Sequence, residues 1–132
     1  MNPKKGGTPR YQKELRQRLK LWYDRMGLRE WRAEIGFCKD EDSDGAAATC
    51  SITEVYLTAH IILFPSVARY WKDRRWDLID EVLVHELSHL LTEPLYRIAL
   101  DAVTNTSKKF LEDVRERQTQ RIAQVVLKRF SE

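Results

Sequence analysis

The residues best suited to chemistry are His85, Glu86 and His89, which form an H-E-x-x-H pattern in the segment H-E-L-S-H. Residues four apart on a helix lie one above the other, so the two imidazoles can converge on a single metal ion. Glu86 lies about 100° around the helix, where it can reach a water molecule on the ion's open position. The pattern predicts a zinc site with Glu86 as the general base for peptide-bond hydrolysis.

The flanking residues favour a buried helix around this pattern. Apolar residues recur there at helical spacing: Leu78, Ile79, Val82, Leu83, Leu87 and Leu90. Asp77 is predicted to cap the start of the helix and Pro94 to end it. Buried imidazoles and carboxylates are costly unless a partner satisfies them, and a metal ion does so for both rings. The competing interpretation is a helix with ordinary hydrogen-bonded histidines.

Hydrophobic periodicity predicts the elements that position this helix. An amphipathic helix is expected over residues 9–26, with Gly27 as its C-cap. Alternating apolar residues predict a half-buried strand over residues 31–38, and two further strands are predicted over residues 47–53 and 55–64. The three strands are expected to form an antiparallel meander.

An aromatic-rich loop or short helix then leads into the H-E-x-x-H helix. Beyond Pro94 we expect a short helix to about Val103 and a longer helix over residues 107–130. The predicted fold class is therefore α+β, with an N-terminal helix, a small antiparallel three-stranded sheet, the H-E-x-x-H active-site helix and a C-terminal helix. Residues 1–9 are predicted to be a flexible basic tail, and residues 10–132 a single domain.

Composition narrows the class of protein. The 132 residues are 42% hydrophobic, without a run long enough for a membrane span. The first residues lack the apolar segment of a signal peptide, so we expect a protein of the cytoplasm of a bacterium or a phage-infected host. The 23 basic residues interleave with 20 acidic ones, which favours solvated helix faces over nucleic-acid binding. Cys38 and Cys50 are expected to be buried free thiols.

The segment at residues 40–45 matches the first half of a calcium loop, D-x-D-x-D-G. The match fails at the twelfth position, where Ser51 has no carboxylate, and strands flank the segment where a calcium loop needs helices. An acidic hairpin loop is the preferred interpretation.

A catalytic zinc site needs three protein ligands and an open position, so one more donor is required. No histidine or cysteine follows His89, which leaves His60 upstream or a carboxylate on the last helix. Glu116 and Glu112 share one face of that helix. Small residues continue the stripe of Glu116 and would let the helix approach closely, which favours Glu116 over Glu112.

The H-E-x-x-H pattern and the order of elements resemble the minimal gluzincin-type zinc metallopeptidases. The resemblance is to the small metallopeptidases of phages and prophages and, more distantly, to the ImmA-like peptidases. SprT-like peptidases open similarly, but they use a third histidine after the pattern, which this chain lacks.

The last helix of the ImmA-like peptidases carries E-x-x-A-N-x-F-A, and the corresponding positions here are Glu116, Thr119, Gln120, Ile122 and Ala123. The resemblance implies that Glu116 is the third zinc ligand. It also implies that Gln120 hydrogen-bonds a zinc-binding histidine. Thr119 and Gln120 depart from the pattern, because they replace its small residue and its asparagine.

The expected function is zinc-dependent hydrolysis of peptide bonds, with one zinc ion per chain. The substrate is expected to lie extended along the sheet edge, paired with the strand at residues 55–64. Tyr96, Tyr70 and His60 are the candidates for stabilising the oxyanion.

The alternative is a non-catalytic, phage-type regulatory or nucleic-acid-binding domain with a structural zinc, suggested by the basic first helix. Glu86 argues against it, since a structural site needs no acid there and usually closes with a fourth protein ligand.

Overall fold

The computed structural model describes residues 9–102 and 108–131, which form four α-helices and three strands. Most of the tail predicted for residues 1–9 and the residues around Val103 lie outside the described part. The elements are α1 (Pro9–Arg25), β1 (Arg32–Phe37), β2 (Ala48–Thr53), β3 (Thr58–Leu63), α2 (Pro65–Lys72), α3 (Trp76–Ala102) and α4 (Lys108–Ser131). The predicted α+β class is confirmed.

The sheet is mixed, and its strand order is β1-β3-β2. β3 pairs parallel with β1 and antiparallel with β2, so the predicted antiparallel meander is wrong. β3 occupies the central position, where a strand loses most of its contact with water. This suits its apolar sequence, because Ala59, Ile61 and Leu63 are all buried. β1 and β2 are left as the two edges.

One face of the sheet packs against the helices, and the other is exposed. The buried residues of β3 join a core formed with Leu15, Leu19 and Trp22 of α1 and the apolar face of α3. On the opposite face, Glu34, His60 and Ser51 lie side by side on the three strands, and all are exposed. The helices therefore cover one face of the sheet and leave the other exposed.

α1 ends as predicted, with Gly27 in the left-handed region at φ 68°, where a glycine carries no Cβ penalty. In the predicted acidic turn, the Asp42 carboxylate accepts hydrogen bonds from the backbone N–H groups of Asp44 and Ala46. Cys38 and Cys50 are free and half-buried. They lie on opposite sides of β3, since β3 separates the two edge strands.

α3 is one long helix, which runs through Pro94 to Ala102, so the predicted stop at Pro94 and the separate short helix after it are wrong. An internal proline removes one backbone hydrogen bond and costs about 3 kcal/mol. Glu93 and Tyr96, on either side of the proline, are buried, and both contact Arg115 of α4, which favours continuation of the helix. The helix also begins at Trp76, which places the predicted cap, Asp77, in its first turn.

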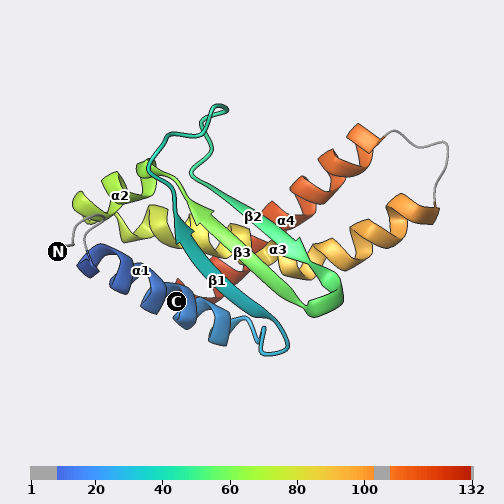
Figure 1. Ribbon diagram of the computed structural model, residues 1–132. Helices are drawn as coiled ribbons and strands as arrows, with labels where there is room; N and C mark the ends of the chain where they lie inside the picture. The colour runs from blue at the N-terminus through green and yellow to red at the C-terminus, as the bar shows by residue number, and fades with distance from the viewer. Residues whose placement is uncertain (1–8, 103–107, 132) are drawn as a thin grey trace.

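α3 and α4 form an antiparallel hairpin whose far end extends beyond the sheet (Figure 1). Contacts between Gln120 and His85, and between Arg115 and Glu93, follow from this antiparallel arrangement. Within the described residues, no helix combines the length and the apolarity needed to cross a membrane.

Candidate metal centre

Five polar side chains lie along one face of α3 at intervals of four residues, and all of them line the same cavity: Glu81, His85, His89, Glu93 and Arg97. The apolar residues between them, among them Leu83, Leu87 and Leu90, are buried in the core on the other face. Because i and i+4 share a helix face, one helix both anchors itself in the core and presents a polar stripe.

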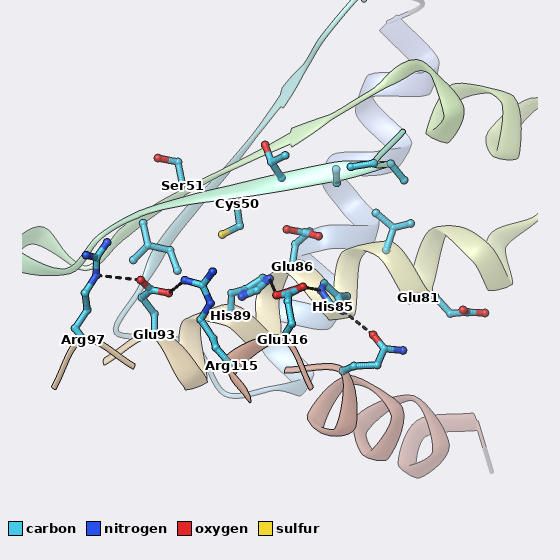
Figure 2. A pocket seen from close by; sticks show the side chains of 17 residues that line it. Cys50, Ser51, Glu81, His85, Glu86, His89, Glu93, Arg97, Arg115 and Glu116 are labelled. Carbon is cyan, nitrogen blue, oxygen red and sulfur yellow. Dashed lines mark hydrogen bonds and ion pairs between the residues drawn. The ribbon is translucent and has the colours of Figure 1, made fainter. Parts of the chain in front are cut away.

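The cavity has a volume of about 760 Å³ and lies between α3, α4 and the edge strand β2. Residues 46–52 form the wall opposite α3, and α4 contributes Arg115, Glu116 and Gln120 (Figure 2). Since β3 is the central strand, the predicted pairing of a substrate with residues 55–64 is wrong. The edge that borders the cavity is β2.

His85, His89 and Glu116 bring three donor groups together. Nε2 of His85 lies 3.3 Å from Glu116 Oε1, and Nε2 of His89 lies 3.4 Å from Glu116 Oε2. A tetrahedron with metal–ligand bonds of about 2.0–2.1 Å has edges of roughly 3.3–3.4 Å. The three ligand atoms all lie within 4.8 Å of one another, so the group is close enough to hold a metal ion.

Gln120 fixes the orientation of the His85 ring. Its Oε1 lies 2.7 Å from His85 Nδ1, and because an amide oxygen only accepts, the ring nitrogen is the donor. With the proton on Nδ1, Nε2 of the neutral ring keeps the lone pair that a metal ion needs. In the protonated ring, Nε2 donates to Glu116 Oε1 instead. Gln120 can orient His85 in this way because it lies one turn after Glu116 on the same face of α4.

The charged groups of the site shift each other's pKa values. The hydrogen bond with His85 lowers the pKa of Glu116, and the same contact raises the pKa of His85. Burial lowers the pKa of His89, which favours the neutral ring that binds metals. A carboxylate therefore already faces both rings where a cation would be held.

Glu86 lies in the cavity beside these groups but is not one of them. Glu86 is only 7% exposed, and burial raises the pKa of its carboxyl group to about 7. A carboxyl group with a near-neutral pKa can both accept and return a proton. Across the cavity, burial raises the pKa of the Cys50 thiol to about 12, so Cys50 is no activated nucleophile.

Close packing of α4 on α3 selects Glu116 over Glu112. Thr119 and Ala123 are buried, and the Thr119 hydroxyl lies 2.9 Å from that of Thr92 on α3. Small side chains at this contact let the two helices approach. Among the described residues, the only convergent group of potential ligands contains Glu116, and Glu112 is not part of it.

None of the three residues predicted to stabilise an oxyanion lines the cavity. His60 is on the exposed face of the sheet, 3.4 Å from Glu34, so it is not a ligand either. Tyr70 packs against the core, and Tyr96 is buried beneath the guanidinium of Arg115. The alternation of β3 turns His60 away from the cavity, Tyr70 belongs to α2, and Arg115 covers Tyr96.

Four charged residues of the cavity were not predicted from the sequence: Glu81, Glu93, Arg97 and Arg115. Glu93 and Arg97 continue the four-residue interval of the histidines. Because the helix was predicted to end at Pro94, the interval was not followed as far as Arg97. Arg115 directly precedes Glu116, and only the packing of α4 brings its side chain to Glu93.

No known family model matches the chain, and no curated protein or solved structure matches it significantly.

Proposed function

We propose that the protein is a zinc-dependent metallopeptidase, related to the minimal gluzincin-type peptidases that its H-E-x-x-H pattern resembles. The observation that carries the proposal is the convergence of His85, His89 and Glu116 beside the buried Glu86 in an open cavity. Two imidazoles and one carboxylate are a donor set suited to zinc. When bound, zinc would supply Lewis-acid activation of a water molecule and of the substrate carbonyl.

Three protein ligands support a catalytic site over a structural one. A structural zinc usually has four protein ligands, whereas a catalytic zinc keeps one position open. Within the described residues the ligand group has three members, and a cavity of about 760 Å³ borders it. The runner-up function, a regulatory or nucleic-acid-binding domain, would not require the open cavity.

Glu86 would serve as the general base and then as the general acid. Its carboxylate takes a proton from the attacking water and passes it to the leaving amine. The raised pKa, about 7, suits both steps near neutral pH. Gln120 would keep the His85 ring in the required orientation.

The edge of β2 is a suitable surface for an extended substrate. Phe64 N–H donates to Ala47 O at 2.9 Å, so in this antiparallel ladder Thr49 and Ser51 also point their backbone groups to β3. The alternation directs the backbone groups of Cys50 and Ile52 to the outer edge. A peptide paired there would lie along the cavity that contains the metal-binding residues.

The decisive experiment measures metal content and cleavage of a fluorogenic peptide library for the wild-type protein and for Glu86→Gln. The wild type should bind close to one zinc per chain and cleave peptides. Glu86→Gln should keep the zinc and lose at least about a hundredfold in turnover, since general-base catalysis contributes roughly 10²–10⁴.

Two further variants interpret this result. Glu112→Gln, on the same helix as Glu116 but outside the cavity, is the matched control and should behave as wild type. His85→Ala should lose the zinc. Full activity of Glu86→Gln, or loss of its zinc as readily as from His85→Ala, would disprove the assigned role. A zinc-loaded wild type that cleaves nothing would favour the structural site.

A further inference from the structure

One end of the cavity is organised around a single buried carboxylate. The residue Glu93 is 5% exposed, and both of its oxygens accept hydrogen bonds from guanidinium groups. Arg97 Nε donates to Oε2 at 3.1 Å, and Arg115 Nη1 donates to Oε1 at 3.2 Å. Figure 2 shows the Arg115 guanidinium between Glu93 and His89, on the side of α3 that faces Cys50. Glu93 thus holds the guanidinium of Arg115 beside the metal-binding residues.

Arg115 is fixed in place but retains unused donors. Its guanidinium lies 4.2 Å from the centroid of the Tyr96 ring, which restrains it further. A guanidinium has five N–H donors. Within the described residues, only Nη1 donates a hydrogen bond, and Nε is buried without a partner. Nη2 therefore remains available to an anionic group in the cavity, because the side chain is still 25% exposed.

The charge of the cavity is uneven along α3. Arg97 and Arg115 are the only cationic side chains, apart from the imidazoles, that line its described part, and both lie at the Glu93 end. The other end has Glu81 and Gln120. An extended ligand along β2 would meet opposite potentials at its two ends.

We propose that Arg115, positioned by Glu93 and Tyr96, binds a carboxylate of the substrate, so that the preferred substrate is a peptide with an acidic side chain on one side of the cleaved bond. This inference rests on the proposed peptidase function and names its substrate class. Arg suits this role because its planar donors match the two oxygens of a carboxylate.

Binding is tested in the zinc-loaded Glu86→Gln protein, so that cleavage is not needed. The probes are fluorescein-labelled octapeptides that differ at one position, which holds Glu, Gln or Lys. This variable position is shifted along the peptide from one set to the next. The protein is titrated into each peptide, and binding is measured by fluorescence anisotropy. At one or two adjacent positions the Glu peptide should bind about tenfold more tightly than the Gln peptide, as expected for a charge-assisted contact. Adding Arg115→Gln should abolish this preference. Arg117→Gln, an exposed change on the same helix outside the cavity, should preserve it.

A second variant guards against misfolding. Arg115→Gln leaves the buried Glu93 with less compensation, which destabilises a protein, so the double variant Glu93→Gln, Arg115→Gln is measured beside it. Circular dichroism and zinc content establish that each variant is folded. Loss of the Glu preference in the folded double variant, with zinc retained, supports the inference.

Cleavage measurements on protein that keeps Glu86 show whether Arg115 acts on substrate specificity or on the reaction itself. Arg115→Gln should raise KM for the Glu peptide about tenfold and leave the Gln peptide unchanged. An equal loss of kcat on both peptides would overturn the inference, because Arg115 would then act on the reacting oxygen. Equal binding of Glu and Gln peptides at all positions would also overturn it, even if the protein cleaves peptides. An Arg115-dependent Glu preference without any cleavage would support the anion site and reject the peptidase function.

Discussion

α1 and α4 both pack on α3, but they do so through different forces. α1 buries Leu15, Leu19 and Trp22 in the core, and the Arg18 and Trp22 side chains also donate hydrogen bonds to Asp80 of α3. In α4, the only buried residues of the described part are Thr119 and Ala123. Val126 and Leu127 of α4 pack against the core at its margin. α4 also contacts α3 through hydrogen bonds and ion pairs, made by Arg115, Glu116, Thr119 and Gln120.

The difference separates the part of the molecule that holds the fold from the part that completes the site. Burial of apolar area is independent of metal and nearly independent of pH. Polar contacts between α3 and α4 depend on the charges of His85, His89 and Glu116, and they would also depend on an ion held between these residues. α4 should therefore be the helix whose attachment responds to metal, and α1 the helix whose attachment does not.

The largest effect is expected from the apolar contact of α1. Leu15 is 0% exposed, and Leu15→Ala should destabilise the protein by about 2–5 kcal/mol through the cavity that it leaves. The thermal midpoint should fall by roughly 10 °C. Val125→Ala on α4, where the residue is 68% exposed, is the control and should change stability by less than about 0.5 kcal/mol. Similar midpoints for the two variants would remove the distinction between the helices.

The next effect concerns the metal ligand that α4 contributes. Glu116→Ala removes one of three donors, so its zinc affinity should fall more than about a hundredfold, beyond the usual effect of losing a hydrogen-bonding partner of a ligand. Glu112→Ala should bind zinc as the wild type does. Titration against a competing chelator measures both constants. Tight binding by Glu116→Ala together with weak binding by Glu112→Ala would reverse the assignment.

Removal of the metal should affect α4 more than α1. A free zinc concentration of a hundred times Kd stabilises the folded state by about 2.7 kcal/mol. A chelator should therefore lower the thermal midpoint of the zinc-loaded protein. Hydrogen exchange should accelerate at the α4 amides near Glu116, with little change at the α1 amides near Leu15. Equal acceleration in both helices would indicate that the ion stabilises the whole fold and not the attachment of α4.

The smallest effect is expected from the residue that orients His85. Gln120→Leu removes the acceptor 2.7 Å from His85 Nδ1, so zinc affinity should fall about 10- to 100-fold. The thermal midpoint of the metal-free protein should change little, since Gln120 is exposed. Gln124→Leu, one turn further along α4 and also exposed, is the control. Unchanged zinc affinity of Gln120→Leu would mean that this hydrogen bond does not orient the ligand.

Some features of the site were readable from local spacing. His85 and His89 face the same way because residues four apart do so on any helix, and α1 follows from its apolar period and its C-terminal glycine. The approach of Glu116 was also anticipated, since Thr119 and Ala123 are small and continue its stripe. These features depend on residues close together in the chain.

Three other features depended on contacts between distant segments. β3 is the central strand because it is the strand most buried by the whole fold, and this leaves β2 as the edge beside the site. Since Ala59 and Ile61 face the core, the alternation of β3 turns His60 to the exposed face. α3 continues through Pro94, where the flanking Glu93 and Tyr96 contact Arg115 of α4. Arg115 meets Glu93 only because α4 lies antiparallel to α3. By itself the sequence determined that His85 and His89 share a helix face, because helical periodicity is local. The tertiary structure decided what surrounds them, because burial and strand pairing are properties of the assembled chain.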